Sequence, residues 1–160
     1  MKICCAAALA AIVATPTLAA ECGAWTAGVE PDEGGPTMIA SVCAAGRPDD
    51  LLLITCGGED KIGLRLVPSV GDDFPPGGDM TYQAAFVFTS GPLSAEVTLH
   101  YEAMDGIMAA TPRRDSALVG ILKSAGPLTV TDKTGVLPTA TFTLKGSSKA
   151  ISKVERACYS

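Results

Sequence analysis

The sequence predicts an α+β domain, in which a mostly antiparallel β-sheet or sandwich is followed late in the chain by two amphipathic helices and is tied together by disulfides. Three observations support this prediction. Short β-rich runs separated by glycine, proline and aspartate turn signals fill the first two-thirds of the chain. After Asp115, apolar residues recur at helical spacing in two separate segments. Four cysteines remain once a predicted secretory signal is removed.

Residues 1–20 have the three parts of a cleavable secretory signal peptide. Lys2 gives a short positive region, residues 3–14 are apolar, and Leu18-Ala19-Ala20 offers small residues to a peptidase. The apolar run is shorter than the roughly 20 residues that a membrane-spanning helix needs, so an N-terminal anchor is the weaker alternative. We therefore expect residues 21–160 to form a single β-rich domain that is periplasmic or secreted and has no membrane span.

The mature chain keeps an even number of cysteines in an oxidising compartment, which predicts two disulfides. These cysteines are Cys22, Cys43, Cys56 and Cys158. A structural metal site is the competing interpretation. The sequence holds no CxxC pair and His100 is its only histidine, which disfavours zinc. No metal and no other cofactor is predicted.

Strand geometry selects one of the three possible pairings. The first two strand-like segments flank a turn-rich stretch, and a hairpin centred there would place Cys22 opposite Cys43. In the next hairpin Cys43 lies near the turn and Cys56 at the far end. Strand rise separates them by roughly 15 Å, which is too far for a disulfide. We therefore predict the bonds Cys22–Cys43 and Cys56–Cys158, the second tying the C-terminal helix to the sheet.

The other elements follow from local patterns. Apolar or β-rich runs bounded by turn residues predict strands over residues 22–28, 37–43, 51–56, 62–67, 81–89, 93–101, 106–109, 128–130 and 139–145. Apolar residues at helical spacing predict a helix over 115–125. A second helix should begin after Gly146, with Lys149, Lys153 and Arg156 toward solvent. Each helix has one apolar stripe, so we expect both to pack on one side of the sheet.

Charge is distributed unevenly along a chain whose formal net charge is −5. Residues 21–105 contain 14 acidic and 3 basic residues, whereas residues 106–160 contain 3 acidic and 8 basic residues. The acidic total disfavours nucleic-acid binding. The simpler interpretation is that the two halves attract each other within one domain. The more specific interpretation is that the C-terminal part of the chain forms a basic face that binds an anionic partner.

Catalytic chemistry has little support in the sequence. His100 is the only imidazole, so a Ser–His–acid hydrolase would have to use it. The strand pattern places His100 with Glu96 and Glu102 on a polar face, which favours a surface histidine. Ser147 or Ser148 could be combined with Lys149 into a Ser–Lys dyad, but a helix cap and its first turn explain these residues better. No catalytic residue is therefore predicted.

Two features are candidates for binding. Asp72, Asp73 and Asp79 lie in one loop rich in glycine and proline, where acidic side chains are most often simply solvated. Their spacing matches no calcium-binding loop. Trp25 is the only tryptophan and lies near Cys22 on the first predicted strand. Core packing against a disulfide is the more common role of such a residue, and a ligand platform is the alternative.

The order of these landmarks carries a family resemblance. A strand ends in cysteine at residues 51–56, and the chain closes with a strand–glycine–helix–cysteine pattern marked by Phe142, Leu144, Gly146, Ala150 and Cys158. Together with the signal peptide and Trp25, this order resembles small periplasmic proteins of the invasion-associated locus B type. It is also similar to accessory periplasmic proteins encoded with type VI secretion systems. The resemblance implies a β-rich, non-enzymatic envelope protein; it carries over no catalytic residue and does not include the pair Cys22 and Cys43.

Three functions are compatible with these observations. The favoured one is an envelope protein that acts without catalysis by binding another protein or an exported polymer. The first alternative is an inhibitor of a cell-wall hydrolase of the lysozyme type, acting through the acidic loop at residues 71–79. The second alternative is a hydrolase that uses His100. The lack of a recognisable catalytic constellation favours the first function.

Overall fold

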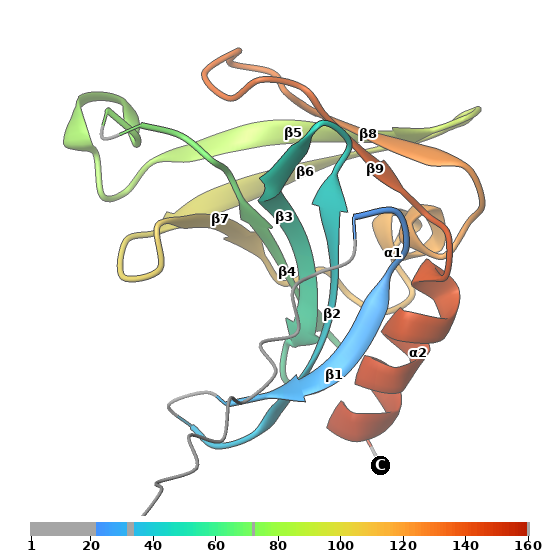
Figure 1. Ribbon diagram of the computed structural model, residues 1–160. Coiled ribbons are helices and arrows are strands. Elements are labelled where there is room, and N and C mark those ends of the chain that lie inside the picture. The colour runs from blue at the N-terminus through green and yellow to red at the C-terminus, as the bar shows by residue number, and fades with distance from the viewer. Residues whose placement is uncertain (1–21, 32–33, 72, 160) are drawn as a thin grey trace, which may run out of the picture.

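The computed structural model describes residues 22–31, 34–71 and 73–159, and these form one antiparallel sheet with two helices (Figure 1). The predicted signal peptide at residues 1–20 and the candidate residue Asp72 lie outside the described residues. In the described part of the chain, no helix has the length and the hydrophobicity needed to cross a membrane. The α+β prediction is confirmed.

The strands are β1 (Thr26–Glu30), β2 (Thr37–Ala44), β3 (Arg47–Cys56), β4 (Ile62–Val67), β5 (Gln83–Ser90), β6 (Leu93–Glu102), β7 (Ile107–Ala110), β8 (Pro127–Asp132) and β9 (Ala140–Thr143). The helices are α1 (Ala117–Leu122) and α2 (Ser147–Cys158), and a single 3-10 turn lies at Pro76–Gly78. The order across the sheet is β1-β2-β3-β4-β7-β6-β5-β8-β9, and every neighbouring pair is antiparallel.

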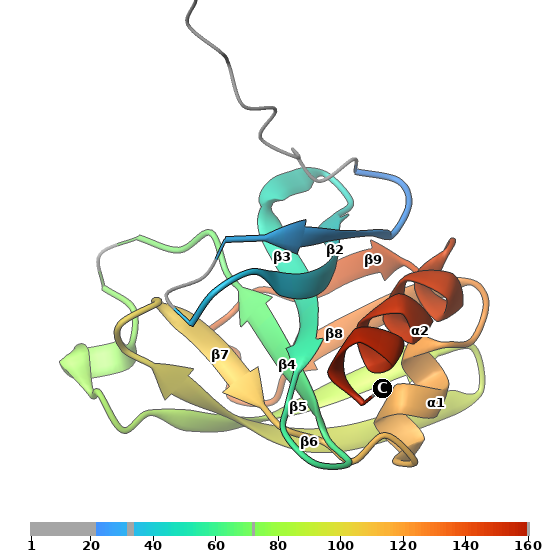
Figure 2. The ribbon, with the colours of Figure 1, turned by 90° about the horizontal axis from the view of Figure 1, so that it is seen from below.

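The sheet rolls until its last strand returns to its first hairpin. The backbone N–H of Ala45, in the β2–β3 turn, donates to the carbonyl of Thr141 in β9 at 2.8 Å. The N–H of Trp25, just before β1, donates to the carbonyl of Lys145 at 2.9 Å. Figure 2 shows β9 next to the β2–β3 hairpin. The two edges of the sheet therefore meet through single hydrogen bonds instead of a continuous ladder.

Two side chains add further hydrogen bonds where the two edges of the sheet meet. The indole N–H of Trp25 donates to the carbonyl of Thr143 at 2.8 Å, and Nη2 of Arg47 donates to the carbonyl of Thr139 at 2.9 Å. The outer edge of β9 would otherwise expose a row of unpaired backbone carbonyls, which can pair with foreign strands. Alternate carbonyls along this edge, from Thr139 to Lys145, are each occupied by a donor from the N-terminal part of the chain.

One hydrophobic core fills the rolled sheet. Alternating residues of the strands point inward, as the period of two requires. Leu52, Ile54, Phe86 and Phe88 are fully buried in this way. The apolar stripes of both helices join the same cluster, through residues such as Leu118, Leu122, Ile151 and Val154. The two helices therefore cover part of the hydrophobic core.

The two helices lie side by side on the same flank of the sheet, as predicted (Figures 1 and 2). Nζ of Lys123, directly after α1, lies 2.6 Å from Oε1 of Glu155 in α2. Helix α1 starts at Ala117, where the Ser116 hydroxyl accepts from the Val119 N–H at 3.4 Å. The prediction that α1 extends to residue 125 was wrong. The chain tightens after Leu122, where the Ser124 N–H and hydroxyl both donate to the Ile121 carbonyl.

Both predicted disulfides are confirmed. The Cα atoms of Cys22 and Cys43 lie 5.1 Å apart, and those of Cys56 and Cys158 lie 5.6 Å apart. The strand geometry used to predict the first bond needs correction, because β1 begins at Thr26 and its register pairs Thr26 with Ser41. Cys22 therefore reaches Cys43 from a turn that precedes the strand, and not from a position directly opposite in the ladder.

Removal of the Cys56–Cys158 bond should destabilise the fold more than removal of the Cys22–Cys43 bond. The first closes a sequence separation of 102 residues and the second one of 21. The chain-entropy model assigns about 4.7 kcal/mol to a loop of about 100 residues and about 3 kcal/mol to one of about 15. Urea unfolding of the C56A/C158A and C22A/C43A variants measures both losses. Equal losses, or a larger loss in C22A/C43A, would show that chain entropy does not set the order.

Candidate functional site

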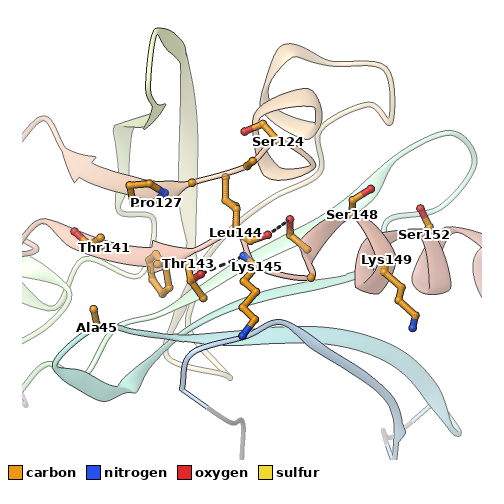
Figure 3. A pocket seen from close by; sticks show the side chains of 15 residues that line it. Ala45, Ser124, Pro127, Thr141, Thr143, Leu144, Lys145, Ser148, Lys149 and Ser152 are labelled. Carbon is orange, nitrogen blue, oxygen red and sulfur yellow. Dashed lines mark hydrogen bonds between the residues drawn. The ribbon is translucent and has the colours of Figure 1, made fainter.

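A groove of about 980 Å³ runs beside the N-terminal half of α2 (Figure 3). We call it the α2 groove. One wall is the connection from α1 to β8, the floor is β9, and the other wall is the start of α2. Its lining residues are Ala45, Ser124, Ala125, Gly126, Pro127, Thr141, Phe142, Thr143, Leu144, Lys145, Gly146, Ser147, Ser148, Lys149 and Ser152.

A glycine sets the angle between the floor and the helical wall. Gly146 has φ of 82°, a left-handed conformation that residues with a Cβ rarely adopt. A Cβ there would also lie 3.4 Å from the Trp25 carbonyl oxygen. The next residue, Ser147, is buried and its hydroxyl donates to the Leu144 carbonyl at 2.8 Å. The chain can therefore turn from β9 into α2 while staying close to Trp25.

Small hydroxyl side chains line the walls of the α2 groove. Ser148 and Ser152 are one helical turn apart, and Figure 3 shows both hydroxyls on the same side of α2. Across the groove, the Ser124 hydroxyl donates to the Ile121 carbonyl at 2.7 Å. Thr143, on the floor, accepts from the Lys145 N–H at 3.1 Å. Within the described residues, the hydroxyls of Ser148 and Ser152 make no hydrogen bond and are available to a ligand.

A row of cations follows the exposed face of α2. Lys149, Lys153 and Arg156 are spaced by four and three residues, which places them on one face of α2, and Lys145 lies two residues before its first residue. We call them the basic stripe. All of them are exposed. None forms an ion pair within the part of the chain that the structure describes, whereas Arg47, Arg65, Arg113, Lys123 and Lys133 all do.

Two further depressions adjoin the α2 groove. The first, of about 310 Å³, lies on the other side of α2 between residues 25–27 and the lysines Lys149 and Lys153. The second, also of about 310 Å³, lies beside the Cys22–Cys43 bond and shares Ala45 and Thr143 with the groove. No aspartate or glutamate is among the described residues that line these three depressions. In a chain with 17 acidic residues, this is a segregated cationic surface.

Both interpretations of the uneven charge find a counterpart in the structure. Nη1 of Arg113 lies 2.6 Å from Oδ2 of Asp60, and Nζ of Lys133 lies 2.9 Å from Oε2 of Glu96. Each of these pairs joins the basic C-terminal part to the acidic N-terminal part. The basic stripe holds four of the eight C-terminal bases and takes no part in that pairing. Ion pairs between the two parts of the chain therefore involve only some of the C-terminal basic residues.

Among the predicted binding residues that the structure describes, only Trp25 borders this surface. Its side chain is only 6% exposed, and its indole N–H is occupied by the Thr143 carbonyl. This burial is what we expect if Trp25 packs in the core and does not serve as a platform for a ligand. Its contribution to the site is to hold β9 and the start of α2 in place.

The acidic loop lies between β4 and β5, on the side of the molecule opposite α2 (Figures 1 and 2). Asp73 and Asp79 are exposed. Oδ1 of Asp79 accepts from the hydroxyl of Thr81 at 2.7 Å and from its N–H at 2.9 Å, and these bonds lower the pKa of Asp79. The ring of Phe74 anchors the loop by edge contacts with Tyr82 and Tyr101, at centroid distances of 5.8 and 5.4 Å.

His100 lies on the polar face of β6, as the alternation predicted. Its side chain is 54% exposed, and Nε2 lies 3.7 Å from Oε1 of Glu102. Among the described residues, no hydrogen bond joins His100 to a serine or threonine. Among these residues, no group of three His, Cys, Asp or Glu side chains is arranged to hold a metal ion.

Comparisons of the chain with protein-family models, with curated proteins and with solved structures gave no match. The resemblance to proteins of the invasion-associated locus B type therefore stays a prediction.

Sequence patterns identified only part of this surface. The solvent-facing positions of Lys149, Lys153 and Arg156 were predicted from the helical period. The groove beside them was not, because its far wall, residues 124–127, belongs to another part of the chain. The spacing of Lys145 with the three other cations was the available signal that a row of charge, and not scattered lysines, follows the helix.

Replacement of Gly146 by alanine should destabilise the protein by about 1–2 kcal/mol, the usual cost of a left-handed conformation for a residue with a Cβ. Gly120 is the matched control, because it is exposed in α1 with nothing within 4 Å of an added Cβ. G120A should stabilise the protein by up to about 1 kcal/mol, since alanine favours helix more than glycine does. Thermal or urea unfolding measures both. A G146A variant as stable as the parent would remove Gly146 from the account of how α2 is placed.

Proposed function

We propose that the mature protein acts without catalysis, by binding an envelope protein or an exported polymer in the periplasm or outside the cell. The α2 groove and the basic stripe form the binding surface. The observation that carries the proposal concerns the described residues: a row of four cations that have no ion-pair partner among them lies next to a groove that none of their acidic side chains lines. The two disulfides support a location in an oxidising compartment.

The electrostatics of the stripe favour an anionic partner. Like charges one helical turn apart repel each other and destabilise a helix slightly. Lys149 and Lys153 stand in that relation, and among the described residues neither forms an ion pair with an acidic side chain. An anionic ligand would relieve this repulsion and would also be drawn toward the stripe before contact. Binding of this kind weakens as salt screens the charges.

Reversal of two stripe charges should abolish capture of the partner. The tagged K149E/K153E variant should recover no specific partner from an envelope extract at low salt, whereas the parent protein should. Glutamate is favourable in the first turn of a helix, so K149E is compatible with folding. The control is K61E/K133E, which changes the net charge equally with residues that do not line any of the three depressions. If both double variants lose the partner equally, total charge and not the α2 surface is responsible.

A second candidate function is inhibition of a lysozyme-type hydrolase through the β4–β5 loop. The observation that favours it is that the loop is acidic, exposed and still anchored, through Phe74 and through the bonds of Asp79 to Thr81. Met80, beside Asp79, is 63% exposed and offers an apolar contact. Inhibitors of standard size act through such pre-ordered loops, because little ordering entropy is lost on binding.

This second function predicts that the parent protein inhibits a cationic lysozyme in a turbidity assay. The D72A/D73A/D79A variant should lose at least about tenfold in inhibition, since paired charges at an interface typically contribute more than about 1.4 kcal/mol. The K149E/K153E variant should inhibit as well as the parent does. Absence of inhibition by the parent, or full inhibition by the triple variant, would remove this loop function.

A further inference from the structure

We infer that the ligand of the α2 surface is an exported acidic polysaccharide, a sugar chain that carries carboxylates. This inference rests on the proposed function and names the partner class for the same site. Three properties of the surface support it: its extended shape, its combination of cations with free hydroxyls, and the absence of features that a protein partner or a bilayer would need.

The shape fits a chain and not a compact small molecule. The α2 groove shares Ala45 and Thr143 with the depression beside Cys22, and it shares Gly146 and Lys149 with the depression beside Trp25. The three are neighbours and together form a tract that crosses the start of α2. Small-molecule sites usually enclose most of their ligand. A tract that is open along its length instead holds successive units of a polymer.

The chemistry along the tract matches a charged sugar. Ser148 and Ser152 offer hydroxyls that have no partner among the described residues, and sugar hydroxyls can donate to and accept from them. Lys149 lines the groove and the depression beside Trp25, so it can reach carboxylates on both sides of the helix. Lys149 and Lys153 lie roughly 6 Å apart along the helix axis, and Lys145 lies just before the helix, which suits repeated negative charges on one chain.

An acidic protein segment fits this surface less well. Extended peptides often bind by adding a strand to a sheet edge. The edge carbonyls of β9 are already taken by Trp25, Ala45 and Arg47. Protein interfaces also centre on buried apolar or aromatic anchors. Large hydrophobic residues that are exposed lie elsewhere in the described chain, at Val29, Val70, Met80, Leu93, Met104 and Val136.

A lipid surface also fits poorly. A bilayer is flat on the scale of one helix and can meet the basic stripe. It cannot reach into a recess walled by residues 124–127 and Ser148. The hydroxyls of the groove would then remain without partners on binding. A polymer chain that enters the groove uses both the hydroxyls and the cations.

The test compares direct binding of the mature protein to four probes by calorimetry. They are polygalacturonate, neutral dextran of similar length, polyglutamate of matched charge, and vesicles containing phosphatidylglycerol. We expect polygalacturonate to bind at least about tenfold more tightly than the other probes do, because only it engages both the cations and the hydroxyls. Equal or tighter binding of polyglutamate or of vesicles, or no binding of polygalacturonate, overturns the inference.

Two variants locate the interaction. K149E/K153E should abolish binding of polygalacturonate. S148A/S152A should weaken it by about threefold to tenfold, the loss expected for one or two hydrogen bonds, without changing the weaker binding of polyglutamate. Alanine is a strong helix former, so S148A/S152A should keep the fold. An unchanged affinity of S148A/S152A for polygalacturonate would show that the ligand is held by charge alone and overturns the sugar assignment.

The inference and the proposed function can fail separately. If polygalacturonate does not bind but K149E/K153E still loses the captured envelope partner, the surface is a binding site for another ligand class. If polygalacturonate does not bind and K149E/K153E captures the same partner as the parent, both the inference and the proposed function are wrong.

Discussion

The closure of the sheet along β9 is the constraint on which the rest of the structure depends. Four donors from the N-terminal part, two of them on Trp25, occupy the outer carbonyls of β9 and its extensions. The bond from the Trp25 indole to the Thr143 carbonyl is partly buried, and a fully buried carbonyl left without a donor would cost about 1–3 kcal/mol. The position of β9 then fixes Gly146, and Gly146 fixes the start of α2. A surface near the C-terminus is thus placed by residues near the N-terminus.

Helix α2 is held at both ends and along one side, which gives its exposed face a defined position. Gly146 packs against Trp25 at the start, the Cys56–Cys158 bond ties the end to β3, and Lys123 pairs with Glu155 between them. The guanidinium of Arg114 also lies 4.2 Å from the centre of the Tyr159 ring, just after the helix. Cations on a fixed helix keep their spacing before a ligand arrives. A ligand with repeated charges therefore meets a preformed row, and less entropy is lost in ordering it.

Local patterns predicted most of the fold, and two of the errors arise from long-range contacts. Alternation and turn residues located the strands, and the even number of cysteines with strand rise gave the correct pairing. The strand predicted over residues 51–56 begins earlier, at Arg47. Asp50 is buried because Arg47 and the backbone N–H of Ser69 satisfy its carboxylate, and Ser69 is 19 residues away. The α2 groove escaped prediction for the same reason, since its walls come from separate segments that only sheet closure brings together.

Net charge is a poor guide to what this protein can bind. At physiological salt the field of an exposed charge is largely screened beyond about 8 Å, so a ligand senses the groups near it and not the total. The acidic β4–β5 loop and the basic stripe lie on opposite sides of the molecule (Figures 1 and 2). Each can therefore act on its own partner although the whole chain is acidic. The acid-free lining of the α2 surface matters more than the formal charge of −5, because charge complementarity is set where ligand and protein touch.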